Sequence, residues 1–382
     1  MNKNQKPIIL VWEVLPILNG GQRVTLETID LTSNFFDFVF LIPSCGQLSN
    51  ELDKRRIPYH CVGSFGNISN KKSLASLIKY EKEKKCIQKN AIKIVNYIKP
   101  NLIYCPGSTA LCTAIVVGKK TNTPVIWHLH HYFNNFLTRF IINIYSLSKT
   151  LCSIISVSDF VGQQIKSNKA KNKLCTVYNA VNPSFYNKNY VVEDIKLLIK
   201  KYEFVFAHIG FIGEAKNQMF SLQVLNKFLI NKIDALLIFV GEKKVNPSYY
   251  LKLKNFIDEK NMKDNVLFLG QRNDINYIIP SLDTVIIPSV EGCPLVFFET
   301  VLSGVSPCVI NYGGAYELSK KFNIGESFDI NNVDSAIKAF NIAKQQKNTF
   351  DCSKLIKFCS KENYANLMCN IFWKAIKNEQ KK

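Results

Sequence analysis

The chain has 382 residues, of which 47% are hydrophobic and 12% aromatic, enough apolar material for two cores of ordinary size. Its formal net charge of +20 indicates an anionic partner, which could be nucleic acid, an anionic membrane surface or a phosphorylated substrate. The basic residues are dispersed along the chain. The sequence carries no signature of a zinc finger, an RRM or a basic zipper, which argues against nucleic acid as the partner.

The cysteines and the first apolar run indicate in which cellular compartment the protein is located. Twelve cysteines are scattered without a C-x2-C pair, several of them inside apolar runs, which favours a reducing environment. The run IILVWEVLPIL is interrupted by Glu13 and followed by Gly20-Gly21, which indicates a strand and a turn rather than a signal peptide. No stretch of about eighteen uncharged apolar residues occurs, so no membrane span is predicted. We therefore expect a cytoplasmic protein.

Residues 7–178 alternate short β-branched runs with amphipathic stretches. The expected strands are PIILVWEVL, DFVFLI, IPYHCV, NLIYC, PVIWHL, CSIISV and LCTVY. Strands that alternate with helices predict a parallel, doubly wound sheet. The stretch from Lys71 to Lys99 is expected to be an exposed helix, because its apolar residues form a single stripe. The run VYNAVNPSFYNKNY is expected to be a linker.

Two motifs in this half are candidates for a site. Gly20-Gly21 follows the first strand, where a tight turn lets the backbone approach a ligand closely. The run WHLHHYF places three of the five histidines after another strand. Alternation puts His128 and His130 on one face and His131 on the other. A metal site is a further interpretation of these histidines, but no third ligand stands at a recognisable spacing.

An aromatic and aliphatic stripe follows the histidines at helical spacing. Its members are Phe133, Phe136, Leu137, Phe140, Ile141 and Ile144. A stripe of this kind most often packs in a core. If it is exposed, it would instead rest on a bilayer surface or line the path of a lipid-linked acceptor.

A second alternating series begins near residue 203. The expected strands are EFVFAHIG, ALLIFVG, NVLFLG, DTVIIP and SPCVI, with helices at residues 218–229, 248–260 and 294–303. This predicts a second Rossmann-like sheet. Because ligands bind at the carboxyl ends of parallel strands, two such domains facing one another would enclose a cleft. A last helix is expected from Lys361 to Lys377.

The run SVEGCPLVFFETVLSGVSPCVINYGGAYE follows the strand DTVIIP and opens a helix at Pro294, where a missing N–H costs nothing. The first N–H groups of that helix, on Leu295 and Val296, and the positive end of its dipole predict an anion site. Glu291 and Glu299 flank this site. Since carboxylates repel phosphate, their expected partners are hydroxyl groups attached to it, such as those of a ribose and a sugar.

These residues resemble the retaining, nucleotide-sugar-dependent glycosyltransferases of the GT-B fold, of the family 4 or group 1 type. That family has two glutamates separated by seven residues and glycines downstream. The matching positions are Glu291, Gly292, Pro294, Leu295, Glu299, Gly304, Gly313, Gly314 and Glu317. The resemblance implies two Rossmann-like domains facing a central cleft. They are an acceptor-binding domain at 1–186 and a nucleotide-sugar-binding domain at 187–355, with a terminal helix at 356–382 that crosses back to the first domain.

The resemblance also implies roles for single residues. Glu299 would bind ribose hydroxyls and Glu291 sugar hydroxyls, while Lys216 would be the main cation on the diphosphate. His130 ends a His-x-His run and would lie beside the transferred sugar. The other implied donor-binding residues are Gly21, Arg272, Cys293, Pro294, Leu295 and Val296. No metal and no cofactor beyond the nucleotide sugar is expected, because the helix dipole and the lysine supply positive charge.

The chain departs from the family pattern at two positions. Phe211 stands where the family has an arginine of a Gly-Arg-x4-Lys motif, and His131 stands where an aspartate is common. A phenyl ring cannot neutralise phosphate, so we expect Arg272 or, second, Arg23 to compensate. The aspartate's supporting role has no counterpart at His131.

The sequence thus predicts a retaining hexosyltransferase of polysaccharide biosynthesis. It would move a sugar from a UDP- or GDP-sugar to the hydroxyl of a glycan or lipid-linked acceptor, in the cytoplasm or peripherally at an anionic membrane face. A nucleotide-sugar epimerase of the same fold is one alternative, since it shares the cleft and needs no acceptor. A non-catalytic protein bound to an anionic surface is another, since it would account for the charge alone.

Overall fold

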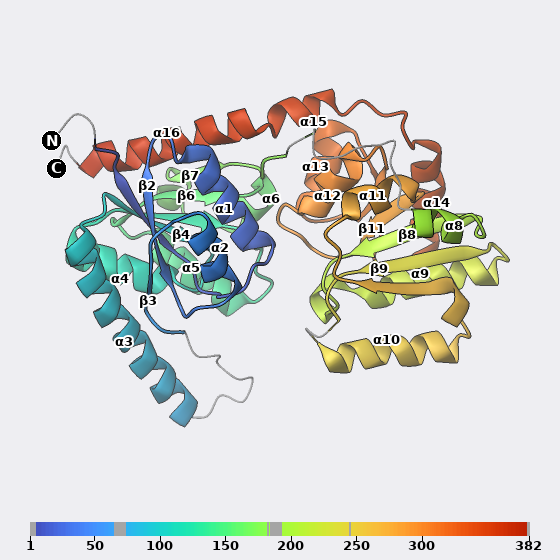
Figure 1. The fold of residues 1–382 in the computed structure, drawn as a ribbon, viewed down its shortest axis with the longest axis horizontal. Helices are drawn as coiled ribbons and strands as arrows, with labels where there is room; N and C mark the ends of the chain where they lie inside the picture. The colour runs from blue at the N-terminus through green and yellow to red at the C-terminus, as the bar shows by residue number, and fades with distance from the viewer. Residues whose placement is uncertain (1–4, 65–73, 182, 184–192, 244–245, 380–382) are drawn as a thin grey trace. The chain divides into compact units, whose positions relative to one another are not determined.

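The computed structural model describes residues 5–64, 74–181, 183, 193–243 and 246–379 (Figure 1). The chain divides into two compact units, one formed by residues 1–179 with 361–382 and the other by residues 180–360. Each unit is built around its own parallel sheet.

The first unit contains a seven-stranded parallel sheet in the order β3-β2-β1-β4-β5-β6-β7. Its strands are β1 Ile8–Trp12, β2 Asp37–Ile42, β3 Tyr59–Cys61, β4 Leu102–Pro106, β5 Val125–Leu129, β6 Leu151–Ser156 and β7 Leu174–Thr176. All seven predicted strands are confirmed. The strand order reverses between β1 and β4, whose register pairs Ile9 with Leu102.

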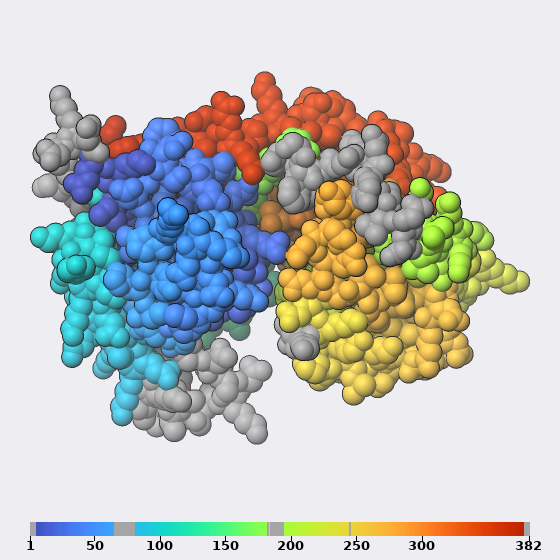
Figure 2. Space-filling model, in the orientation of Figure 1, coloured from blue at the N-terminus to red at the C-terminus, as the bar shows by residue number. Residues whose placement is uncertain are grey.

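Helices cover this sheet and join its parallel strands (Figure 1). They are α1 Gly20–Thr32, α2 Gln47–Lys54, α3 Leu74–Ile98, α4 Leu111–Thr121, α5 Phe136–Ser146, α6 Asp159–Gly162, α7 Asn168–Lys171 and α16 Lys361–Glu379. The predicted exposed helix corresponds to α3. Figure 2 shows α1 and α2 (blue) and part of α16 (red) at the surface of this unit.

The terminal helix α16 belongs to the first unit although it follows the second in the chain. Its Tyr364 hydroxyl lies 2.6 Å from the Thr28 hydroxyl of α1. Its Phe372 ring meets Phe36 and Tyr104 edge-on, with centroids 5.5 and 5.3 Å apart. These buried contacts attach α16 to the sheet of the first unit, as predicted for the last helix.

The second unit contains a six-stranded parallel sheet in the order β10-β9-β8-β11-β12-β13. Its strands are β8 Phe204–Ile209, β9 Ala235–Val240, β10 Val266–Gly270, β11 Thr284–Ile287, β12 Pro307–Ile310 and β13 Glu326–Phe328. Five of these were predicted. The sixth, β13, is a three-residue edge strand without a β-branched run, so the sequence pattern does not reveal it.

The helices of the second unit are α8 Glu193–Ile199, α9 Gln218–Ile230, α10 Pro247–Glu259, α11 Ile275–Ile278, α12 Leu295–Leu302, α13 Gly314–Phe322, α14 Val333–Gln345 and α15 Ser353–Phe358. On one face of the sheet, rings from β8, α9 and α14 form an aromatic core: Phe204 and Phe228 stack with centroids 4.9 Å apart, and Phe206 and Phe340 meet edge-on at 5.0 Å. The opposite face of the same strands packs in a second apolar cluster. The sheet is therefore buried on both faces, as parallel sheets are.

The structure corrects two expectations. The helix expected to begin at Pro294 begins at Leu295, because Pro294 has extended backbone angles (φ −71°, ψ 127°). The stripe expected to pack in a core lies mostly at the surface: Phe136 is 75% exposed and Phe140 55%. The cause is the way α5 docks, since Asn143 on its inner side donates to the Gln164 carbonyl and accepts from the Lys166 N–H, which fixes the helix through polar contacts.

Among the described residues, no helix is both long enough and apolar enough to span a bilayer.

Candidate active site

The predicted donor residues gather at one edge of the second sheet. Lys216 follows β8, and Glu291 follows β11. These two strands are neighbours, and the strand order reverses between them, with β9 and β10 on one side and β12 and β13 on the other. In open parallel sheets such a switch point leaves a crevice at the carboxyl ends of the strands, where ligands bind.

Lys216 and Glu291 meet directly across this switch point. The Lys216 ammonium donates to Glu291 Oε1 at 2.6 Å, and the Ser289 hydroxyl donates to the same oxygen at 2.8 Å. Both ionic side chains are largely enclosed, with 23% and 21% of their surface exposed. The carboxylate therefore holds the ammonium in place before any ligand arrives.

The Phe211 ring flanks the same ammonium. Lys216 Nζ lies 5.5 Å from the ring centroid, a cation–π distance. A Cβ atom on Gly213 would lie only 2.9 Å from Phe211 Cε2, so the ring packs closely over this glycine. Where the family has a cationic side chain, this chain has a ring that orients the neighbouring cation and adds no charge.

Two polar residues that sequence reasoning missed stabilise this arrangement. Asn217 has a left-handed backbone (φ 57°) between Lys216 and α9, and its Nδ2 donates to the Pro288 carbonyl at 3.2 Å. It thereby ties the loop after β8 to the loop after β11. Ser289 orients Glu291. An asparagine after the lysine was a usable signal, because Asn adopts the left-handed region more readily than most residues.

A glycine pair after β12 supports the Glu291 loop from the other side. The Gly314 N–H donates to the Glu291 carbonyl at 2.7 Å. A Cβ on Gly314 would lie 1.6 Å from the Gly292 carbonyl oxygen, so only glycine permits this contact. Gly313 adds a positive φ of 102°. The Gly-Gly motif therefore serves to bring α13 against the segment that carries Glu291, and Glu317 lies half-buried in the first turn of that helix.

The helix α12 begins beside this segment. Leu295 and Val296 are its first two residues, whose N–H groups have no carbonyl to pair with inside the helix. Glu299 lies one turn beyond Leu295 and is half-buried. Cys293 and Pro294, just before the helix, are buried and shape its approach. The anion site inferred from the sequence thus begins four residues after Glu291.

Arg272 occupies a different position. It follows β10, which is separated from β8 by β9. Its Nε donates to Asp274 Oδ1 at 2.7 Å, and this hydrogen bond lowers the pKa of the Asp274 carboxyl. The guanidinium is therefore engaged with a carboxylate of its own loop.

In the first unit, the histidines gather at the carboxyl end of β5. The His128 and His130 rings lie 4.1 Å apart between centroids, which confirms that they share a face. His128 Nδ1 is 2.5 Å from the Tyr104 hydroxyl. Burial lowers the pKa of His128 to about 3, and it lowers the pKa of His130, with further contributions from His128 and His131. Both imidazoles are therefore neutral near pH 7.

Metal ligation by these histidines finds no support within the described ranges: they contain no group of three or more His, Cys, Asp or Glu placed to hold a metal ion. That the reaction needs no metal remains a prediction. The buried Nε2 atoms of His128 and His130 have no hydrogen-bond partner among the described residues. His130 thus retains a donor or acceptor atom for a polar ligand.

The N-terminal glycines lie inside α1 rather than in a turn before it. Gly20 and Gly21 are its first two residues, and a Cβ at either position would meet no atom within 4 Å. The protein's own packing therefore does not require glycine there. Glu13 lies buried beside these first turns of α1. Its carboxyl accepts from Gln22 Nε2 at 3.0 Å and from the Thr25 hydroxyl at 2.7 Å. Burial raises the pKa of Glu13 to about 7, although these hydrogen bonds lower it.

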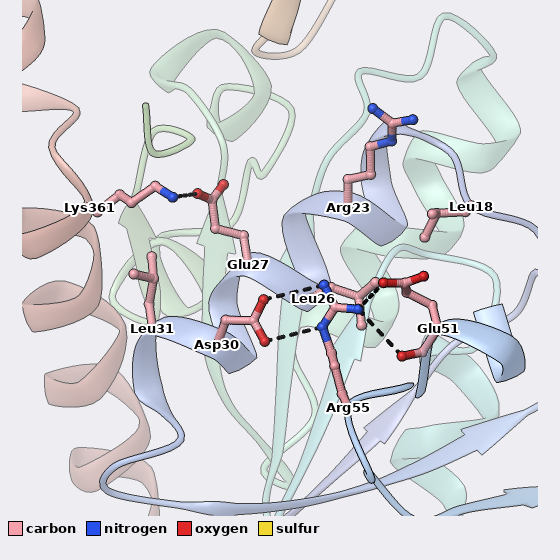
Figure 3. Close-up of a pocket in the computed structure, with 9 residues that line it drawn as sticks. All are labelled: Leu18, Arg23, Leu26, Glu27, Asp30, Leu31, Glu51, Arg55 and Lys361. Atoms are coloured by element: carbon pink, nitrogen blue, oxygen red, sulfur yellow. Dashed lines mark hydrogen bonds and ion pairs between the residues drawn. The ribbon is translucent and has the colours of Figure 1, made fainter. Parts of the chain in front are cut away.

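A separate pocket of about 280 Å³ opens beside α1, α2 and α16 (Figure 3). Its charges are mostly paired: Arg55 bonds Asp30 and Glu51, and Lys361 bonds Glu27 at 3.1 Å. Figure 3 shows Arg23 extending away from these pairs. The pocket does not coincide with the Lys216–Glu291 site. Because the cationic and anionic side chains that line it balance one another, it has no preference for an anion.

Comparison with known proteins identifies the second unit. The profile of the family described as Glycosyl transferases group 1 matches residues 192–357, which include Lys216, Glu291 and Glu299. Over 342 residues the chain is 27% identical to the UDP-Gal:alpha-D-GlcNAc-diphosphoundecaprenol alpha-1,3-galactosyltransferase of Escherichia coli, covering 86% of this chain and 85% of that protein. Residues 192–357 therefore match the group 1 glycosyltransferase family.

Similarity to solved structures shows that the chain has the GT-B fold. The crystal structure of Anabaena HepE in complex with UDP-glucose is 17% identical, with a TM-score of 0.73 over 98% of this chain and 100% of that one. The lipopolysaccharide outer core galactosyltransferase WaaB is 14% identical, with a TM-score of 0.70 over 96% of this chain and 99% of that one.

A further relative was found by sequence. The capsular polysaccharide biosynthesis glycosyltransferase CapH of Staphylococcus aureus is 23% identical over 73% of this chain and 74% of that protein.

Proposed function

We propose that this protein is a retaining hexosyltransferase that takes its sugar from a UDP-hexose and passes it to a hydroxyl of a lipid-linked glycan. The observation that carries the proposal is the Lys216–Glu291 pair at the switch point of the second sheet, next to the first N–H groups of α12. Positive charge for a diphosphate and a carboxylate for hydroxyls stand side by side there. UDP is favoured over GDP because the Escherichia coli relative uses UDP-Gal and HepE was solved with UDP-glucose.

In the proposed reaction the bond between the anomeric carbon and the diphosphate oxygen breaks, and the acceptor oxygen bonds to that carbon. The negative charge that develops on the diphosphate is stabilised by the Lys216 ammonium and by the N–H groups of Leu295 and Val296. The acceptor's proton passes to a diphosphate oxygen. No metal is needed in this scheme, because the chain supplies the compensating charge.

Retention of configuration is proposed from the resemblance at Glu291 and Glu299, and the state of Glu291 bears on how retention would be achieved. Its Oε1 accepts hydrogen bonds from both Lys216 and Ser289, which makes the carboxylate a weak nucleophile. Attack by the acceptor on the face that the diphosphate leaves then fits better than a covalent glycosyl–enzyme intermediate. Glu291 would accept hydrogen bonds from sugar hydroxyls, and half-buried Glu299 would accept them from the ribose.

His130 would contribute from the first unit. Because its imidazole is neutral near pH 7, it can hydrogen-bond a sugar or acceptor hydroxyl without adding charge beside the reacting carbon. The lipid-linked acceptor is proposed because the Escherichia coli relative acts on alpha-D-GlcNAc-diphosphoundecaprenol. CapH extends the proposal to polysaccharide biosynthesis.

The test is a transfer assay with UDP-hexoses and GDP-hexoses against a lipid-linked GlcNAc diphosphate, with and without EDTA. We expect an α-linked product from an α-linked donor, seen by the anomeric proton signal in NMR, and activity that survives the chelator. Lys216→Ala should lose turnover about 10- to 1000-fold, whereas Lys252→Ala, which removes an exposed lysine of the same unit, should not. Conversion of the donor without any acceptor would replace this proposal by an epimerase. Loss of activity in EDTA that Mg²⁺ restores would refute the metal-free scheme.

A further inference from the structure

The exposed face of α5 is apolar along its whole length. Every exposed position of this helix carries a large hydrophobic side chain. These residues are Phe136, Leu137, Phe140, Ile141 and Ile144, between 39% and 75% exposed, and Leu147 continues the stripe at 40%. Phe136 and Phe140 stack on one another with centroids 6.5 Å apart. Soluble proteins rarely leave such a contiguous patch uncovered without an interaction that uses it.

The opposite side of α5 is attached to the protein by polar contacts. Asn143 donates to the Gln164 carbonyl and accepts from the Lys166 N–H. Arg139 donates to the Tyr132 hydroxyl at 3.2 Å. The helix is thus fixed with its apolar stripe outward, and turning the stripe inward would break these bonds.

The stripe lies in the most basic part of the chain. Residues 84–179 contain thirteen Lys and Arg and one acidic residue, Asp159, a formal charge of +12 out of +20 for the whole chain. Exposed Lys149 follows the stripe directly, and the backbone of exposed Lys166 bonds Asn143 on the inner side of the same helix. An apolar strip with cations at its border complements a phospholipid surface with anionic headgroups.

We propose that α5 docks this protein on an anionic bilayer, with the stripe in the acyl–headgroup boundary and the lysines among the headgroups. Two other occupants fit less well. A second copy docked through the same stripes would bring two basic borders together, which like-charge repulsion opposes. Nucleic acid would meet the lysines but leave the uncharged stripe facing phosphates. The docking rests on α5 itself, and only its benefit, access to a lipid-linked acceptor, rests on the proposed function.

The test is co-sedimentation of the full chain with vesicles of phosphatidylcholine alone or with phosphatidylglycerol. Binding should require phosphatidylglycerol and weaken as salt rises from 0.1 to 1 M, where the Debye length falls from about 10 to 3 Å. The double variant Phe140→Glu, Ile144→Glu should reduce the partition coefficient by roughly tenfold or more. The matched controls Ile230→Glu and Leu251→Glu, 66% and 60% exposed on the second unit, should bind as the wild type does. All variants change exposed residues and should keep the wild-type melting temperature.

Three results would overturn the docking. They are no vesicle binding, binding that is indifferent to phosphatidylglycerol, and binding that is unchanged in the double variant. A dimer in light scattering that Phe140→Glu dissociates, without vesicle binding, would assign the stripe to a second copy. Retention on RNA that competes with vesicles and survives the double variant would assign the charge to nucleic acid. Transfer to a short soluble acceptor separates this proposal from the enzymatic one: activity without vesicle binding refutes only the docking, and vesicle binding without activity refutes only the transferase.

Discussion

Removing the Lys216 ammonium should do more than delete one cation. In the structure this ammonium lies 2.6 Å from Glu291 Oε1, so it neutralises a carboxylate beside the proposed diphosphate seat. In Lys216→Met that carboxylate still accepts the hydrogen bond from the Ser289 hydroxyl, but it has lost the neutralising ammonium. A diphosphate entering the site then meets an unneutralised negative charge. The variant should therefore lose affinity for UDP through two separate effects.

The two effects have different sizes and can be separated. The lost charge-assisted hydrogen bond is worth about 1.5–3 kcal/mol. A carboxylate and a phosphate about 5 Å apart repel by roughly 1–3 kcal/mol at effective dielectric constants between 80 and 20. Together they predict a UDP affinity lower by about two to four orders of magnitude. Glu291→Gln in the Lys216→Met background removes the second effect alone, so the double variant should bind UDP about five- to a hundredfold more tightly than Lys216→Met.

Titration calorimetry with UDP measures this directly, because UDP lacks the sugar whose hydroxyls Glu291 is proposed to bind. A matched control is the exposed pair Lys252 and Glu214, 3.8 Å apart in the same unit. Lys252→Met with Glu214→Gln should leave the UDP affinity unchanged. If the double variant at the site binds UDP no better than Lys216→Met, Glu291 does not face the diphosphate and the assignment of both residues is refuted.

Further outcomes follow from the packing of single residues. Gly314→Ala should lower both the melting temperature and the UDP affinity, because its Cβ would lie 1.6 Å from the Gly292 carbonyl oxygen; thermal denaturation with and without UDP measures both. Gly21→Ala, which meets no atom within 4 Å, should keep or raise the melting temperature, and a loss of turnover at full stability would show that a ligand approaches this backbone. Glu13 binds its proton more tightly folded than unfolded, since its pKa rises from 4.5 to about 7, so its stabilising contribution is complete below pH 4.5 and is lost as the pH rises to 7. Urea denaturation of wild type and Glu13→Gln should therefore show the wild type losing roughly 2–4 kcal/mol relative to the variant between pH 5 and pH 8, and equal losses would show that Glu13 is not buried as described.

Most of the fold could be predicted because its strands are buried on both faces. A parallel strand covered by helices reads as a continuous apolar run, as in FVFAHI or ALLIFV, and such runs located twelve of the thirteen strands in the described residues. Strand β13 reads ESF and packs at the sheet edge, so neither composition nor length marks it. Periodicity failed differently at α5. It correctly predicted an amphipathic helix. It could not show that Asn143 would hydrogen-bond the Gln164 carbonyl on the inner side, which leaves the apolar side of the helix facing outward.

The site was predictable in its parts and not in its assembly. The strand–turn–helix pattern around Glu291 and the glycine turn before Lys216 are local, so the sequence displays them. The contact between Glu291 and Lys216 spans 75 positions and exists because β8 and β11 become neighbours in the sheet. Sequence spacing carries no information about that adjacency. Ser289 and Asn217 were missed for the same reason, since each matters through a bond to the opposite loop or to the paired carboxylate.

The substitution at Phe211 is best understood through the residues packed around it. Its ring covers Gly213 and lies beside the Lys216 ammonium, so the aromatic side chain is part of how the lysine is oriented. Arg272, the candidate for replacing the missing charge, is bonded to Asp274 on a loop separated from β8 by a whole strand. Phe211→Arg therefore exchanges an orienting contact for a second cation about 5.5 Å from the first, which by Coulomb's law costs about 1–3 kcal/mol in the empty site. A bound diphosphate would reverse that cost, because it attracts both cations. We accordingly expect this variant to melt at a lower temperature than the wild type without ligand and to gain more stability from UDP, and a variant that gains less would show that the phosphates lie away from Phe211.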